Sequence, residues 1–219
     1  RLRCLRTIGA LRLTTPGDVA IDTAYFQRVA RFNVGVGGVH STGAVPETLG
    51  QAMIWRPELA TDFTETYAAL ADLERHGYRR ARGNLDLALR AFMATYDRAP
   101  TRPDTCLVDA ITALEAVLGD AAELSFRLAF RVASLLASTD DERVALLRQI
   151  KSFYDTRSKV VHGGRIAPKQ QAALDAVDDL RNHVRRLLRG MVHLATSNKR
   201  AGETDTLKGD LDAALMHSE

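Results

Sequence analysis

Residues 123–138 read ELSFRLAFRVASLLAS, and this segment is apolar around most of a helical turn. Two apolar stripes run along it at helical spacing, with Leu128 in one and Phe130 in the other. Its polar side is narrow, because Arg127, Arg131 and Ser134 follow one another at intervals of four and three residues. A helix of this kind packs at the centre of a helical bundle, so the segment predicts an all-α fold.

A buried arginine on that helix needs an acidic partner, because an unpaired guanidinium is costly to remove from water. Glu115 is the candidate, since it stands beside the apolar stripe of the preceding helical segment, residues 103–119. The alternative interpretation of Glu115 is an exposed charge. We predict that Glu115 pairs with Arg131 and that both residues support the fold.

Residues 57–197 predict six helices, and together these form the helical bundle. Helix start and stop signals bound them at 57–77, 84–100, 103–119, 123–138, 139–163 and 168–197. The last helix carries an apolar seam and, on its other side, five basic residues: Arg181, Arg185, Arg186, Arg189 and His193. These basic residues form either a solvated helix face or a basic rim that guides RNA. Residues 198–219 predict a polar tail or a short docking helix.

Residues 1–56 differ from the bundle and are interpreted as a β-rich or irregular segment. Arg6–Leu13 and Val19–Ile21 are short strand-like runs, with a Pro16-Gly17 turn signal between them. The glycine-rich run Phe32–Val39 lacks the lysine and hydroxyl residue of a phosphate-binding loop, which favours a flexible β segment or linker. Too few strands are present for an independent sheet, so we expect the edge of an upstream domain or a small annex.

Composition and charge are those of an ordinary globular chain. The 219 residues are 46% hydrophobic and 26% charged, and the net charge of +3 permits an anionic partner without requiring one. Cys4 and Cys106 match no metal-ligand spacing, so they predict reduced thiols, and we expect no metal and no cofactor. No apolar run is long enough for a membrane span, and no secretory leader is visible. We therefore expect a cytoplasmic protein with no membrane partner.

A second segment, residues 154–164, reads YDTRSKVVHGG and combines two residues suited to phosphate chemistry. Arg157 can grip a phosphate with two N–H groups, and His162 can carry a proton near neutral pH. RNA is cut without a metal ion when a base takes the proton of the ribose 2′-hydroxyl and cations stabilise the charge that builds on phosphorus. We therefore predict that Arg157 and His162 are catalytic and that Tyr154, Ser158 and Lys159 contact the RNA substrate.

The interval between Arg157 and His162 also has a simpler interpretation. Five residues of regular helix correspond to about 140° of rotation and about 7.5 Å of rise, so the two side chains do not share a face. They converge if the helix frays at Gly163, or if two copies of the chain bring their helix ends together. Otherwise Arg157 is a surface residue and His162 caps the negative end of the helix.

Three segments resemble those of a known family in their order and spacing. They are residues 109–118 (DAITALEAVL), 126–136 (FRLAFRVASLL) and 154–163 (YDTRSKVVHG). From about Asn84 to Ala195, the chain resembles an ApeA-like member of the HEPN domains (higher eukaryotes and prokaryotes nucleotide-binding). The hallmark of this family is an arginine, four to six further residues, and then a histidine. Residues 1–56 are not covered by the resemblance.

The resemblance implies an all-α bundle, a homodimer with the motif at the dimer cleft, and metal-independent endoribonuclease activity in toxin or anti-phage defence systems. It places Arg157 and His162 at the catalytic positions. It also implies RNA as a partner, together with an upstream sensor domain or a neutralising partner protein. Ser158 is a departure, since many active members carry an amide or an acid directly after the arginine. Inactive members bind RNA or nucleotide, or only assemble larger proteins, and this non-catalytic module is the alternative to the dimeric ribonuclease that we favour.

Overall fold

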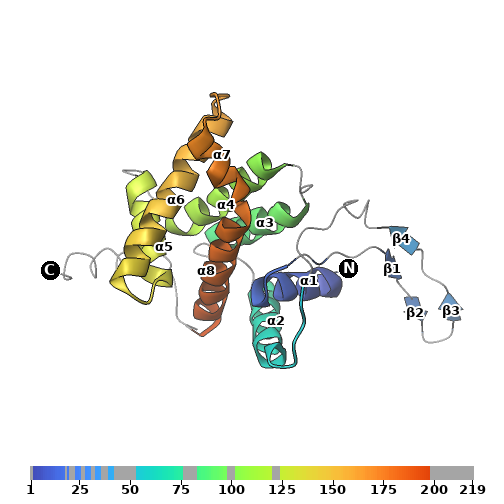
Figure 1. Cartoon of the computed structure of the whole chain (residues 1–219). Coiled ribbons are helices and arrows are strands. Elements are labelled where there is room, and N and C mark those ends of the chain that lie inside the picture. The colour runs from blue at the N-terminus through green and yellow to red at the C-terminus, as the bar shows by residue number, and fades with distance from the viewer. Residues whose placement is uncertain are drawn as a thin grey trace.

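The structure is a computed structural model that describes residues 2–17, 19, 23–25, 28–30, 33–35, 39–41, 53–75, 83–97, 102–119 and 124–197. Its helices are α1 (Leu2–Thr14), α2 (Leu59–Arg75), α3 (Gly83–Asp97), α4 (Pro103–Leu118), α5 (Leu124–Leu136), α6 (Asp140–Val161), α7 (Pro168–Asp175) and α8 (Val177–Ser197). Figure 1 shows α8 with α5 on one side and with α1 and α2 on the other. The predicted helical bundle is confirmed for the described residues.

The central helix of the bundle is α4, which packs against α3, α5, α6, α7 and α8. Its residues Ile111 and Leu114 are fully buried. On α5, Leu128 and Val132 are also fully buried, whereas Phe126 leaves 54% of its surface exposed. α5 therefore contributes to the core without lying at its centre, because α4, α6 and α8 cover it and leave the Phe126 side open.

α1 corrects the prediction for the N-terminus, where Arg6–Leu13 was expected to form a strand. Ala10 and Leu13, three residues apart, are both buried, and this is the interval of a helix face rather than the alternation of a strand. The helix packs against α2 and α8, and Arg6 forms an ion pair with Glu74 of α2. α1 thus belongs to the hydrophobic core of the bundle, while the domain boundary at residue 56 stays a prediction.

The described strands are four segments of three residues in two antiparallel pairs. β1 (Thr23–Tyr25) pairs with β4 (Val39–Ser41), and β2 (Arg28–Ala30) pairs with β3 (Asn33–Gly35). Of the predicted run Val19–Ile21, Val19 has no regular structure, and the other two residues lie outside the described part of the chain.

α6 begins where the sequence predicts, because Thr139 is its N-cap. The Thr139 hydroxyl accepts the N–H of Glu142 at 3.2 Å, and the Glu142 carboxylate accepts the N–H of Ser138 at 2.8 Å. Acidic residues fill the first turn, where the helix dipole favours negative charge. Ile150 and Phe153 are buried and hold α6 against α4 and α5.

The single helix predicted for residues 168–197 is in fact two helices. α7 ends at Asp175, and α8 starts at Val177 after a turn at Ala176. α7 packs against α4 and α6, whereas α8 packs against α1, α2, α3, α4 and α5. The bend allows Leu174 and Val177 to stay buried against these different neighbours. The predicted tail, residues 198–219, lies outside the described residues.

Candidate functional site

The C-terminal end of α6 closes in a Schellman motif. Gly163 has the left-handed backbone conformation, with φ of 65°, that glycine adopts without strain. Its N–H donates to the carbonyl of Val160 at 3.2 Å, and the N–H of Gly164 donates to the carbonyl of Lys159 at 2.8 Å. These bonds satisfy the last carbonyls of the helix, so α6 stays regular to Val161 and the convergence by fraying at Gly163 does not occur.

His162 is the C-cap residue of α6, and its side chain is exposed to solvent. Its backbone N–H donates to the carbonyl of Ser158 at 3.1 Å, which fixes the position of the residue at the helix end. An exposed imidazole in a fixed position can reach a substrate and exchange a proton with it. The geometry of His162 therefore suits an acid or base that acts at the surface.

Arg157 lies slightly more than one turn before His162 and points inward to α4. Its Nη2 is 3.5 Å from Oε2 of Glu115, and the side chains of the two residues are 25% and 20% exposed. Its Nε is buried and has no acceptor among the described residues. A guanidinium carries five N–H donors, so the ion pair joins α4 to α6 and leaves donors of Arg157 available.

Tyr154 joins the same group from one turn earlier on α6. Burial raises the pKa of its hydroxyl, the negative charge of Glu115 raises this pKa further, and the positive charge of Arg157 opposes the shift. The phenol therefore stays protonated at neutral pH beside the Glu115 carboxylate. We call Glu115, Tyr154 and Arg157 the α4–α6 cluster.

The structure separates the other predicted site residues from this cluster. Ser158 is half-buried, and Lys159 is exposed with its side-chain stem beside Gly164. Among the described residues, no hydrogen bond or ion pair joins Arg157 to His162. One copy of the chain therefore holds the arginine and presents the histidine without bringing them into contact.

Arg131 lies outside the cluster, because its predicted partner Glu115 lies with Arg157 instead. Arg131 is only 1% exposed, and its Nη1 donates to the carbonyl of Leu118 at 2.6 Å. Leu118 is the last residue of α4, where carbonyls lack a partner within the helix and the dipole is negative. The end of α4 thus supplies an acceptor to the buried Arg131.

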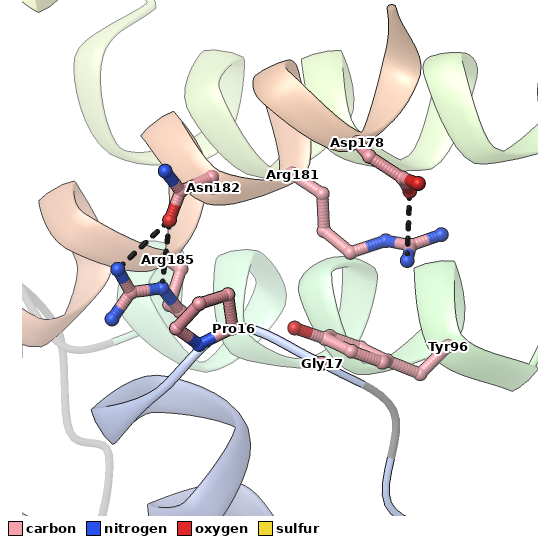
Figure 2. A pocket seen from close by; sticks show the side chains of 7 residues that line it. All are labelled: Pro16, Gly17, Tyr96, Asp178, Arg181, Asn182 and Arg185. Atoms are coloured by element: carbon pink, nitrogen blue, oxygen red, sulfur yellow. Dashed lines mark hydrogen bonds and ion pairs between the residues drawn. The ribbon is translucent and has the colours of Figure 1, made fainter. Parts of the chain in front are cut away.

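Tyr96 of α3 lies among three further arginines that the sequence did not bring together. The Cζ atoms of Arg12 and Arg181 are 4.4 Å and 4.8 Å from the centroid of the Tyr96 ring. Figure 2 shows Arg181 extending from α8 over Tyr96 with its guanidinium bonded to Asp178, and Arg185 beside Pro16 with its guanidinium bonded to Asn182. The interpretation of these α8 residues as a solvated face is wrong for Arg185, which is only 9% exposed.

The arginines of α8 also bind the ends of other helices. Arg185 donates from Nη1 to the carbonyls of Leu13 and Thr14, the last two residues of α1, at 3.2 Å and 3.0 Å. Arg181 donates from Nη2 to the carbonyl of Thr95 in the last turn of α3, and Arg186 donates to Leu136, the last residue of α5. We therefore interpret Arg181 and Arg185 as packing residues.

Cys106 is a free, buried cysteine beneath Tyr96 and Arg181. Its Sγ donates to the carbonyl of Thr95 at 2.9 Å and lies 3.1 Å from Nη2 of Arg181. Burial raises the pKa of this thiol, and the positive charge of Arg181 only partly offsets that effect. Cys106 therefore stays protonated and packs as a small core residue.

Neither a metal site nor a membrane span is found in the part of the chain that the structure describes. Its His, Cys, Asp and Glu side chains form no group of three or more that could hold a metal ion. None of its helices is both long and apolar enough to cross a membrane.

Comparisons of the chain with protein-family models, with curated proteins and with solved structures gave no match. The resemblance to HEPN domains therefore rests on the three sequence segments quoted above.

Proposed function

We propose that this chain is a metal-independent endoribonuclease of HEPN type that cuts RNA with Arg157 and His162. One observation supports it most directly: Glu115 holds Arg157 in an ion pair, while His162 is exposed at the closed end of the same helix. An arginine that is already fixed in place loses little freedom when it binds a phosphate. The end of α6 therefore offers a phosphate clamp and a proton carrier.

In the proposed reaction, His162 takes the proton of the ribose 2′-hydroxyl, and the 2′ oxygen attacks the adjacent phosphorus. The bond from phosphorus to the 5′ oxygen breaks, the leaving oxygen takes a proton from water, and the protonated His162 returns its proton to the hydroxide ion that this leaves. Arg157 stabilises the negative charge that builds on the phosphate oxygens in the transition state. The products are a 2′,3′-cyclic phosphate, or its opened form, and a 5′-hydroxyl. DNA has no 2′-hydroxyl and stays intact.

The proposal requires a homodimer, because Arg157 and His162 of one chain are not in contact. A twofold contact between two α6 ends would bring His162 of one copy to Arg157 of the other. Val161, next to His162, leaves 48% of its surface exposed and suits such an apolar contact. A role in toxin or anti-phage defence, with an upstream sensor domain or a neutralising partner protein, belongs to the same proposal.

Incubation of the purified chain with total RNA in EDTA tests the proposal. We expect the wild type to cut RNA and His162→Ala to cut slower by orders of magnitude with an unchanged fold, since His162 is exposed. Lys151→Ala is the matched control, because Lys151 is exposed on the same helix, and it should cut like the wild type. Cutting that depends on added magnesium, or that His162→Ala retains, would contradict the proposal.

A non-catalytic module is the second candidate, and the commitment of Arg157 to Glu115 favours it. The ion pair links α4 to α6, as a purely structural pair would. In that case no RNA is cut under any condition, and Arg157→Ala lowers the melting temperature while binding of RNA or nucleotide persists.

A further inference from the structure

Five residues of α8 line an open groove, and none of them is acidic. They are Arg185, Arg186, Arg189, Gly190 and His193, and we call this surface the α8 groove. Their spacing places them on one face of the helix. From residue 185 to residue 193 the helix rises about 12 Å, which is longer than a single phosphate group. The α8 groove is therefore an elongated basic surface rather than a pocket for one small anion.

The positive charge of the α8 groove is only partly balanced. Arg189 pairs with Asp62 of α2 at 2.8 Å. Arg185 and Arg186 contact no carboxylate among the described residues, because they bind Asn182 and the backbone carbonyls at the ends of α1 and α5. Burial lowers the pKa of Arg185; Tyr96 opposes that shift, and the like charges of Arg189 and Arg186 lower the pKa further. A negatively charged ligand would relieve this repulsion.

Gly190 leaves space for a ligand between the arginines. A Cβ added at this position would meet no atom within 4 Å. Glycine inside a helix is about 1 kcal/mol less favourable than alanine, so helix stability does not explain its presence here. The lining offers no Phe, Tyr or Trp ring on which a base could stack, and the His193 imidazole in it is already hydrogen-bonded to Thr66. It also offers no carboxylate or amide side chain that could read a base edge.

We propose that the α8 groove binds the sugar–phosphate backbone of single-stranded RNA, without regard to base sequence. Guanidinium groups supply donors to phosphate oxygens, and such contacts position a nucleic acid without reading its sequence. Figure 1 places the C-terminal half of α8 beside α2, away from α7 and the end of α6. The choice of RNA rests on the proposed function, and the groove then anchors an RNA strand that is cut at the end of α6.

Substitutions that add a negative or a positive charge at residue 190 test this proposal. The full chain carries His162→Ala so that RNA stays intact, and a fluorescein-labelled single-stranded RNA reports binding by anisotropy. Gly190→Glu should weaken binding about fivefold, and Gly190→Lys should strengthen it by a similar factor. Gly190→Gln adds similar bulk without charge, so it is the reference against which both charged variants are compared. Because a structural disturbance would weaken both charged variants, equal affinities of the Glu and Lys variants would overturn the proposal.

Arg186→Ala is a second test that does not depend on residue 190. It should weaken RNA binding and reduce the slope of log affinity against log salt concentration by about one. Arg90→Ala removes the same charge from an exposed position on α3 and should leave both quantities unchanged. Polyphosphate should compete with the RNA, whereas inorganic phosphate at the same phosphorus concentration should not. Equal competition by the two would show a single-ion site and would contradict backbone binding.

The cutting assay separates this inference from the proposed function. In the chain that retains His162, Gly190→Glu should raise KM and leave kcat unchanged, because the groove holds RNA without touching the reacting atoms. If the chain cuts RNA but the residue 190 variants bind it equally, the groove inference alone fails. If the variants bind as expected but no RNA is cut, the ribonuclease proposal alone fails.

Discussion

Arg131 and Arg157 come from neighbouring helices and bind the same last turn of α4, but they bind it in different ways. Arg131 of α5 is buried and donates to the backbone carbonyl of Leu118. Arg157 of α6 is one quarter exposed and pairs with the carboxylate of Glu115, whose negative charge also raises the pKa of Tyr154. The first arginine closes a helix end inside the core, whereas the second is held at the surface with donors available.

The difference teaches that the end of a helix can supply an acceptor to a buried arginine. The last carbonyls of a helix lack partners and carry about half a negative charge in sum. Arg181, Arg185 and Arg186 also donate to the ends of α3, α1 and α5, and Arg181 pairs in addition with Asp178 on its own helix. Arg157 pairs with a carboxylate on a neighbouring helix and shares its helix end with an exposed histidine, so it is the better candidate for function.

Arg131→Ala should have the largest effect on stability, and it tests the structural role of that residue. The substitution leaves a cavity and a buried carbonyl without its donor, so we expect the free energy of unfolding to fall by about 4 kcal/mol. Urea denaturation followed by circular dichroism measures the change. Arg127→Ala, on the half-buried side of the same helix, should cost less than about 1 kcal/mol. Similar losses in both variants would remove the distinction between Arg131 and other arginines.

Gly119→Ala should have the next largest effect, because this residue closes the turn that both arginines bind. Its N–H donates to the carbonyl of Glu115 at 2.8 Å, and a Cβ at this position would collide with that same carbonyl. We expect a loss of about 2 kcal/mol in the free energy of unfolding. Gly190→Ala is the control, since a Cβ there meets no atom within 4 Å. A Gly119→Ala variant as stable as this control would show that the end of α4 is not constrained.

A double-mutant cycle with Glu115→Gln and Arg157→Ala measures the ion pair of the α4–α6 cluster. The pair is long and partly exposed, so we expect a coupling free energy of about 1 kcal/mol. Each single variant should nevertheless lower RNA cutting strongly if Glu115 positions a catalytic arginine. Full cutting by Glu115→Gln would show that Glu115 does not position Arg157.

Tyr154→Phe should have the smallest effect on stability. It removes the hydroxyl beside Glu115 and keeps the half-buried ring, so the free energy of unfolding should fall by about 0.5 kcal/mol. In a spectrophotometric titration, the wild type should contain one tyrosine that ionises above the usual pH range of tyrosine and that is missing from the variant. An unchanged titration would contradict the contact between Tyr154 and Glu115.

Most helices could be predicted from the sequence, because local signals define them. The Thr139 cap, Pro103 and Gly163 act within a few residues of their own positions, and they set the ends of α4 and α6 as expected. α1 was missed because Ala10 and Leu13 face partners on α2 and α8, which no local pattern shows. The bend at Ala176 likewise follows from packing against different neighbours rather than from a breaking residue.

The candidate site was predictable in its residues but not in its contacts. The sequence indicates Arg157 and His162 by type and spacing, and it indicates Glu115 as the partner of an arginine. It could not show which arginine, because the carbonyl of Leu118 is an acceptor with no side-chain signature. The sequence also did not indicate that residues 2–14 form a helix that ends before Pro16-Gly17. The arginine that binds the end of that helix, Arg185, could therefore not be predicted.

The chemical ends of the cut RNA test the central claim about Arg157 and His162 most directly. RNA incubated with the wild-type chain in EDTA can be examined by mass spectrometry, with Arg131→Lys, Arg157→Ala and His162→Ala in parallel. Attack by the 2′ oxygen predicts 2′,3′-cyclic phosphate and 5′-hydroxyl ends from the wild type and from the folded Arg131→Lys protein. Arg157→Ala and His162→Ala should produce almost none of these ends. Ends with a 3′-hydroxyl and a 5′-phosphate, or cyclic phosphate ends formed equally by Arg157→Ala, would contradict the account.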